Sequence, residues 1–295
     1  MMNDKKIIAL GFFDGVHLGH QVLLRQCCTL ATQRGCLAAA ITFDRHPQSL
    51  FRKDPPPLLT TGQDRRRLLR EYGIGSIFQY PVEEKTMSMP WQAFLEELIS
   101  FGGAGFVCGQ DFRFGYRGAG DAEKLSRFCE ERSLPCVIVP EQSLDAVRIS
   151  STHIRSLLAL GHMETAKKFL GHPHLLTGKV VTGRRLGGKL GFPTANVLIP
   201  PGIACPRHGV YACTVRVDGQ PFIAVTNVGS RPTVDGHQVR TESWLLDFSG
   251  DLYGKTVTLE FHYFLRPEKK FDSLEQLQAA VQADAARARS YFGEN

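Results

Sequence analysis

The first half of the chain alternates short apolar runs with segments in which apolar residues recur at helical spacing. Runs of this length favour buried strands, and a helical repeat between two runs favours a crossover helix. Strands joined by such helices pair in parallel, so we expect a doubly wound α/β domain with ligands at the carboxyl ends of its strands. The expected strands cover residues 7–13, 37–43, 76–80, 105–109 and 135–140, and the expected helices 19–34, 61–72, 88–100 and 121–132.

The pattern changes near Gly171, after two further helices expected over 151–160 and 163–170. Beyond a linker of composition Gly171-His172-Pro173-His174, β-rich runs separated by Gly, Pro and Asp predict an antiparallel barrel. A helix capped by Ser273 and ending at Tyr291 closes it. The β-rich runs cover 177–182, 209–217, 222–228, 240–248 and 256–264. We therefore expect two domains, a Rossmann-like α/β domain over 1–170 and a barrel over 171–295.

Composition narrows the possible partners. The 295 residues suffice for two cores, and a formal charge of +6 suits phosphate-rich ligands. The eight cysteines form no C-x-x-C pair, which argues against zinc. We expect a cytoplasmic protein without a membrane partner, because neither a cleavable leader nor an apolar stretch of membrane-spanning length is recognised. The basic cluster Arg65-Arg66-Arg67 with Arg70 is interpreted as a solvated helix face, not as a nucleic-acid site.

The most informative segment is Gly11-Phe-Phe-Asp-Gly-Val-His-Leu-Gly-His20, directly after the first apolar run. A helix that begins near His17 would place His17 and His20 on one face of its first turn. Unpaired backbone N–H groups and the positive end of the helix dipole lie at the same place, so the segment suits a polyphosphate. The alternative is a strand–turn–helix with two incidental surface histidines.

This segment resembles the His-x-Gly-His motif of the nucleotidyltransferase superfamily and, more narrowly, the bacterial bifunctional riboflavin kinase/FAD synthetase family. Three further segments match that family, at residues 42–47 (Thr-Phe-Asp-Arg-His-Pro), 109–115 and 148–155. The resemblance implies an N-terminal nucleotidyltransferase domain that adenylylates FMN with ATP and releases pyrophosphate. It implies phosphate contacts for His17, His20, Arg148, Ser151 and Arg155, and ATP or flavin binding for Gly11, Phe12, Asp14, His46, Asp111 and Phe112.

A second motif, Gly191-Phe-Pro-Thr-Ala-Asn196, resembles the Pro-Thr-Ala-Asn motif of riboflavin kinases. The resemblance implies that Thr194 and Asn196 hold Mg²⁺ together with the ATP phosphates, which must supply the anionic ligands. It also implies ATP or flavin binding by Gly178, Gly191 and Arg266. The upstream stretch 183–189 satisfies most of a P-loop pattern, but Leu190 replaces the required hydroxyl, so Walker-type binding is rejected. Gly188 stands where many relatives carry Arg.

Glu242 is the candidate general base of the second domain. Strand alternation places it on the face of Trp244, Leu246 and Phe248, interpreted as an inward apolar face on which an acid is costly. The resemblance assigns it the proton of the ribityl 5′-hydroxyl of riboflavin. A salt bridge with Arg240 or Arg266 is the structural alternative.

The chain is thus expected to phosphorylate riboflavin to FMN and to adenylylate FMN to FAD, with Mg²⁺ and with ATP as co-substrate. One alternative is a chain in which only the kinase activity is retained. Another is a flavin-sensing binding protein that has kept both pockets and lost turnover. The sequence does not predict the oligomeric state.

Overall fold

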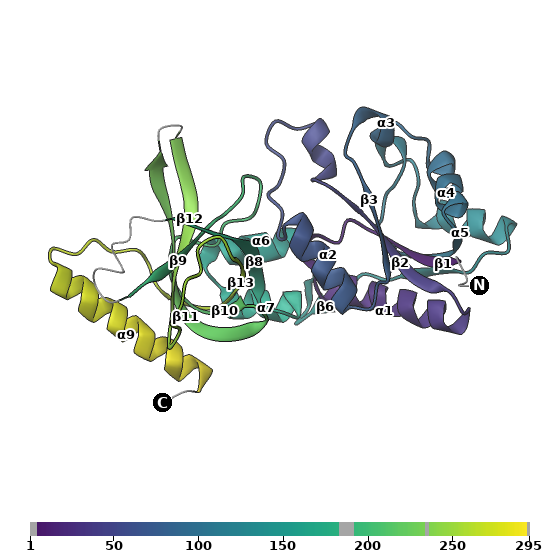
Figure 1. The fold of residues 1–295 in the computed structure, drawn as a ribbon. Coiled ribbons are helices and arrows are strands. Elements are labelled where there is room, and N and C mark those ends of the chain that lie inside the picture. The colour runs from purple at the N-terminus through teal and green to yellow at the C-terminus, as the bar shows by residue number, and fades with distance from the viewer. Residues whose placement is uncertain (1–4, 183–191, 234–235, 294–295) are drawn as a thin grey trace. The chain divides into compact units, whose positions relative to one another are not determined.

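The computed structural model describes residues 5–182, 192–233 and 236–293, and Figure 1 shows them as a ribbon. Contacts between Cα atoms divide the chain into two compact units. The first contains residues 1–58 and 62–151, and the second contains 59–61 and 152–295.

The first unit is built on a five-stranded parallel sheet in the order β3-β2-β1-β4-β5. Its central strand β1 is buried on both faces, as expected of a strand covered by helices on either side. Residues Ile8 and Leu10 pack toward α4 and α5, while the Cys27 thiol of α1 donates to the carbonyl of Ile7. The doubly wound α/β fold is confirmed. The strands are β1 (Lys6–Leu10), β2 (Leu37–Phe43), β3 (Ser76–Tyr80), β4 (Gly103–Gly109) and β5 (Cys136–Val139), with a small hairpin of β6 (Ser143–Leu144) and β7 (Val147–Arg148).

The helices of this unit begin and end close to the expected positions. They are α1 (Leu18–Gln33), α2 (Gly62–Glu71), α3 (Glu84–Met87), α4 (Trp91–Ser100) and α5 (Ala122–Glu131), with short 3-10 turns η1 (Asp14–Val16), η2 (Pro47–Leu50) and η3 (Tyr116–Gly118). Asp121 caps α5 by accepting a hydrogen bond from the backbone N–H of Lys124, as its place before the helix favours.

Strand β1 ends at Leu10, three residues before the predicted end at Phe13. The physical reason is the turn that follows. Phe13, Gly15 and Val16 have φ angles of 57°, 81° and 41°, which no strand accommodates. The two non-glycine residues are buried in this left-handed conformation, which indicates a turn held in place by its surroundings.

The second unit is a closed antiparallel barrel in the order β10-β11-β12-β9-β8-β13. Strand β9 was not predicted, because it is short and follows Pro193 directly. Fully buried Thr241 and Ser243 face the barrel interior, where the Thr226 hydroxyl donates to that of Ser243 at 2.9 Å. The elements are α6 (Ser151–Leu160), α7 (Met163–Leu170), β8 (His174–Val181), β9 (Thr194–Leu198), β10 (Gly209–Val217), β11 (Gln220–Thr233), β12 (Gly236–Leu245), β13 (Thr256–Arg266) and α9 (Leu274–Phe292).

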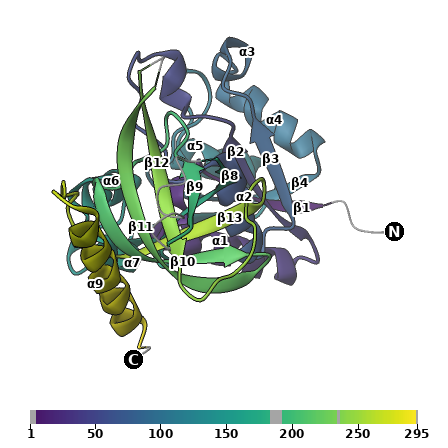
Figure 2. The same cartoon turned by 60° about the vertical axis from the view of Figure 1, so that its left-hand side comes forward.

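Helix α9 covers part of the outer face of the barrel beside β10 and β11 (Figure 2). Ser273 caps it by accepting a hydrogen bond from the N–H of Gln276. Its small residues Ala285 and Ala288 pack against Val210, Ala212 and neighbouring apolar side chains of the barrel. Helix α7 packs on β13 and β8 in the same unit. The predicted closing helix is confirmed.

Candidate active sites in the two units

The histidine pair of the first unit lies where β1 ends and α1 begins. His17 is the N-cap residue of α1, and its Nδ1 accepts a hydrogen bond from the backbone N–H of His20 at 3.3 Å. An accepting Nδ1 places the N–H donor of the neutral ring on Nε2. The rings of His17 and His20 are stacked with centroids 3.6 Å apart, so the predicted shared face is present.

The surroundings of His20 oppose its protonation. Burial lowers the pKa of His20 well below its ordinary value, and the nearby His17 and Arg65 lower it further. Its Nδ1 is buried without a hydrogen-bond partner among the described residues. A neutral imidazole in a positively charged environment remains able to gain a proton or donate to an anion once negative charge arrives.

Phe12 connects the motif with the segment that follows β2. Its ring meets the His46 ring edge-on at 5.4 Å, and its carbonyl accepts a hydrogen bond from the Thr42 hydroxyl at 2.8 Å. His46 caps η2 through its Nδ1, which accepts from the N–H of Gln48. Gly11 is required by packing, since a Cβ there would lie 2.8 Å from the Phe13 ring. The residues predicted from 11–20 and 42–47 are therefore brought together.

The first unit also contains four predicted site residues from the other two segments, namely Asp111, Phe112, Arg148 and Ser151. The Ser151 hydroxyl donates to the carbonyl of buried Asp14 at 3.0 Å, which ties the start of α6 to the motif. Arg148 contacts Asp111 and, at 2.8 Å, Glu141. All three side chains are more than a third exposed, so these ion pairs contribute little stability and can rearrange around a ligand. Phe112 stacks on Phe114 at 5.8 Å, at the edge of the core.

Arg155 lies on α6 and belongs to the second unit, which contains the residues from 152 onward. Its Nη1 donates to the hydroxyl of Thr152 at 3.3 Å. Its phosphate contact stays a prediction.

The interpretation of Arg65 as part of a solvated face was wrong. Its side chain is 1% exposed, and its guanidinium lies 4.6 Å from the centre of the Phe12 ring and donates to the carbonyl of Phe43. Only Arg70 of the cluster is exposed. The helix turns Arg65 onto the same buried face as Leu68 and Leu69, and apolar periodicity does not reveal such a charged member.

In the second unit, a cavity of about 590 Å³ opens at the end of the barrel where β9 begins. Both predicted metal ligands, Thr194 and Asn196, line it. The Asn196 side chain is almost fully buried, and its Nδ2 donates to the Thr194 carbonyl at 3.3 Å, which fixes the orientation of the amide. The remaining wall comes from β8, from β9 and the residue before it, from β12 and from the loop after β12: Val180, Pro193, Ala195, Leu245, Phe248, Ser249, Gly250, Asp251, Leu252 and Tyr253.

Glu242 is a neighbour of these ligands. It pairs in register with Asn196 on one side and Asn227 on the other, so three polar side chains cross the face of β9, β12 and β11. Paired residues of an antiparallel ladder have Cα atoms about 5 Å apart. The Asn227 amide donates to Glu268 at 3.2 Å.

The expected direction of the Glu242 face was wrong. It shares its face with Trp244, as predicted, but Trp244 packs with the α9 cluster on the outer side of the barrel. The interior face carries Thr241 and Ser243 instead. Because α9 covers the outer side, the outer face of β12 carries the large apolar residue Trp244 while the interior face carries small polar ones, so alternation alone does not tell which face is interior.

Two other predicted residues have structural partners. The Arg266 guanidinium makes three hydrogen bonds with Asp284, the shortest 2.8 Å, so it ties β13 to α9. Gly178 lies so close to β9 that a Cβ there would stand 2.5 Å from Val197 Cγ1. Their flavin and ATP contacts stay predictions. Gly191, Gly188 and the stretch 183–190 lie outside the described residues.

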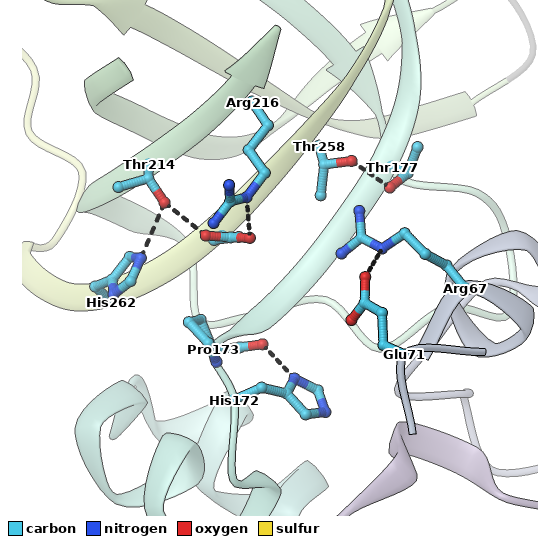
Figure 3. A network of polar contacts seen from close by, with 10 residues as sticks. Arg67, Glu71, His172, Pro173, Thr177, Thr214, Arg216, Thr258 and His262 are labelled. Atoms are coloured by element: carbon cyan, nitrogen blue, oxygen red, sulfur yellow. Dashed lines mark hydrogen bonds and ion pairs between the residues drawn. The ribbon is translucent and has the colours of Figure 1, made fainter. Parts of the chain in front are cut away.

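A polar network on the outer side of β10 and β13 is separate from these residues (Figure 3). The Thr214 hydroxyl donates to Glu260 at 2.8 Å and lies 3.1 Å from His262 Nε2, and Arg216 donates to the same carboxylate at 2.7 Å. Because the single hydroxyl proton goes to Glu260, His262 must donate from Nε2. Burial lowers the pKa of His262 to about 4.

The chain thus combines a parallel α/β unit, which has stacked histidines at a strand–helix turn, with a barrel whose cavity is lined by Thr194 and Asn196. A strand–helix turn of this kind is typical of a site for phosphate groups. Comparison with known sequences identifies the family of each unit. The riboflavin kinase family model matches residues 170–292, and the FAD synthetase family model matches residues 1–153.

Full-length relatives agree with both matches. The bifunctional riboflavin kinase/FMN adenylyltransferase of Listeria monocytogenes is 33% identical over 294 residues, covering 98% of this chain and 93% of the relative. The enzyme of the same description from Escherichia coli K12 is 34% identical over 295 residues, covering 97% and 93%. The chain belongs to the family of bifunctional riboflavin kinase/FMN adenylyltransferases.

One solved structure, described as a macrolide-efflux protein from Streptococcus pneumoniae, matches with a TM-score of 0.86 at 29% identity. The match covers 98% of this chain and 97% of that one. Across residues 5–182, 192–233 and 236–293, none of the helices combines the length and apolar character needed to cross a membrane.

Proposed function

We propose that the two ATP-dependent reactions of this family are divided between the α/β domain and the barrel domain of the chain. The barrel phosphorylates riboflavin to FMN, and the α/β unit transfers the adenylyl group of ATP to FMN, which gives FAD. We place the functional boundary at 170/171, with the adenylyltransferase domain before it and the kinase domain after it. The observation that carries the division is that each unit contains a polar cluster of its own, His17 and His20 in the first and Asn196 and Glu242 in the second.

For adenylylation, a phosphate oxygen of FMN attacks the α-phosphorus of ATP and pyrophosphate leaves. The nucleophile is already ionised at neutral pH, so the site needs to orient the reactants and stabilise charge on phosphate oxygens. The start of α1 supplies backbone N–H groups and the His17 and His20 rings for this task. Arg148, Ser151 and Arg155 are the further donors, and Phe12, Asp14, His46, Asp111 and Phe112 surround the nucleotide and flavin.

For phosphorylation, the ribityl 5′-hydroxyl of riboflavin attacks the γ-phosphorus of ATP and ADP leaves. Glu242 takes the hydroxyl proton as this bond forms. Its position beside Asn196 supports this role, because it puts the base next to a residue assigned to the Mg²⁺ that accompanies the ATP phosphates.

The residues at the barrel cavity fit Mg²⁺. Thr194 and Asn196 offer a hydroxyl and an amide oxygen, which are hard, uncharged ligands. The described residues contain no group of three or more His, Cys, Asp or Glu side chains that could hold a metal ion. The ATP phosphates would therefore provide the negative charge, and a bound Mg²⁺ would polarise the transferred phosphoryl group.

We also propose that the protein works in the cytoplasm on small molecules alone, without nucleic-acid or membrane partners. All eight cysteines are free thiols, and four of them are buried. Burial raises the pKa of Cys27, Cys108 and Cys213 to about 12, which keeps these thiols protonated and unreactive. Free thiols are typical of a reducing compartment.

One experiment tests the assignment. The purified chain is incubated with riboflavin, ATP and Mg²⁺, and the flavins are resolved by chromatography. Formation of FMN followed by FAD is expected. FMN alone would support the kinase-only alternative, and unchanged riboflavin would support the flavin-sensing alternative.

A further inference from the structure

Arg65 is the bulkiest side chain that is fully buried among the described residues. It lies on α2, whose Leu68 and Leu69 are also buried. An ionised side chain is costly to bury unless nearby charges and hydrogen bonds replace the lost water. What surrounds Arg65 therefore indicates why the chain keeps a charge there.

The contacts of Arg65 come from the two segments that leave β1 and β2. From the first segment, the Phe12 ring lies against the guanidinium at 4.6 Å. From the second, the carbonyl of Phe43 accepts a hydrogen bond from Nη2. One side chain thus holds together the segments that contain His17, His20 and His46.

The charge of Arg65 is only partly compensated. Burial lowers the pKa of Arg65 to about 10, while the nearby Asp14 and Asp44 act in the opposite direction. The group therefore remains a cation at neutral pH. Its Nε and Nη1 are buried without a hydrogen-bond partner among the described residues. A buried cation with two unsatisfied donors is well placed to stabilise negative charge that arrives nearby.

The positive charge of Arg65 acts on the histidine pair. Arg65 is one of the groups whose positive charge acts on His20. Its neighbour Arg66 differs, since that side chain is partly exposed and its Nη1 donates to Gln79 at 2.7 Å. Arg66 therefore provides a matched comparison, with the same charge on the same helix but outside the buried contact.

We propose that Arg65 is a positioning residue of the adenylylation site, whose buried guanidinium holds the segments after β1 and β2 together and supplies positive charge behind the histidine pair. The inference rests on the proposed adenylylation site at His17 and His20. Arg65 acts through Phe12, Phe43 and its electrostatic field, and the polyphosphate of ATP is the ligand that benefits.

The test measures kcat and KM for ATP in both reactions of the full-length chain. Arg65→Met, which keeps an unbranched side chain but removes the charge and donors, is expected to raise KM for ATP in FAD formation about tenfold or more. KM for ATP in FMN formation should stay within about twofold, as should both constants in Arg66→Met. Arg65→Lys keeps the charge but loses the planar fork, and a smaller increase is expected.

The inference is overturned if Arg65→Met and Arg66→Met change KM equally. It is also overturned if Arg65→Met lowers kcat only in proportion to its folded fraction and leaves KM unchanged. Should Arg65→Met not fold, Arg65→Lys decides, and a wild-type KM for ATP in that variant rejects the inference. His20→Ala is measured alongside. If FAD formation survives that substitution, the proposed site itself is wrong, whereas an effect of His20→Ala without one of Arg65→Met rejects only the role of Arg65.

Discussion

The imidazole rings of His17 and His20 lie face to face, with centroids 3.6 Å apart and planes inclined by only 13°. Two rings in this arrangement cannot both be charged without strong repulsion, and burial already disfavours the charged form of His20. In the free protein, His20 is therefore neutral at pH 7. Negative charge beside the pair would oppose this preference, because it stabilises the protonated ring.

His20→Ala is expected to lower FAD formation from FMN by about 100-fold or more, because it removes a donor to the phosphates of the transition state. FMN formation from riboflavin should be unchanged, so FMN accumulates. Chromatography of the flavins measures both reactions in one sample. His162→Ala, an exposed histidine just before α7, is the control and should leave both rates unchanged. Equal loss of FMN formation in His20→Ala would contradict the division into two sites.

Glu242→Gln is expected to slow FMN formation by about 10²- to 10⁴-fold, the effect of a lost general base. The amide keeps the shape of the side chain and cannot take the hydroxyl proton. KM for riboflavin and ATP should change little, and FAD formation from supplied FMN should not change. Glu164→Gln, an exposed glutamate on α7, is the matched control. If the variant retained its kinase rate, the base would have to be sought elsewhere around the cavity.

Thr194→Val is expected to raise the Mg²⁺ concentration at half-maximal kinase activity about tenfold, because it exchanges a hydroxyl ligand for a methyl group of similar shape. The Mg²⁺ dependence of FAD formation should stay at its wild-type value. A titration of both activities with Mg²⁺ measures this difference. Thr256→Val, at the exposed start of β13, controls for the substitution itself. An unchanged Mg²⁺ titration of the kinase would remove Thr194 from the metal site.

The sequence predicted much of this molecule where local pattern decides the outcome. Strand β2 and helices α6 and α7 cover the predicted residues, and the shared face of His17 and His20 follows from helical spacing. Tertiary context decided the rest. Arg65 is buried by Phe12 and Phe43, which lie far from it in sequence. The direction of Glu242 depends on α9, which packs on the barrel from the far end of the chain.

The barrel is expected to lose stability in acid through His262. Burial, the positive charge of Lys167 and, less strongly, that of Arg216 lower its pKa to about 4, against the attraction of Glu260. Since the folded-state pKa lies below the unfolded value of about 6.5, this contribution is complete above pH 6.5. It is lost as the pH falls from about 6.5 to 4, and amounts to about 3 kcal/mol.

Urea unfolding at several pH values measures this loss. A Trp91→Phe background leaves Trp244 in the barrel as the fluorescent probe, because the chain has two tryptophans. His262→Gln keeps a hydrogen-bonding group near Thr214 and cannot be protonated, so its stability should depend less steeply on pH than that of the wild type. The exposed His208→Gln should retain the wild-type slope. A steep slope in His262→Gln would assign the acid sensitivity to another group, such as buried His174.

Asp284→Asn is expected to destabilise the second unit by about 3 kcal/mol, because it leaves the Arg266 guanidinium without the charge that compensates its partial burial. The Asp284 side chain is 3% exposed and accepts three hydrogen bonds from the Arg266 guanidinium. Asp247→Asn is the matched control, since the pair of Asp247 with Arg289 also joins α9 to the chain after β12 but has an Asp side chain 73% exposed. An exposed pair of this kind contributes less than about 1 kcal/mol.

Denaturant unfolding followed by Trp244 fluorescence compares the stabilities of the two variants. Kinase activity should also fall in Asp284→Asn, because α9 supports the face that carries Trp244 and Glu242. Equal stabilities of the two variants would show that Arg266 is not held in place by Asp284.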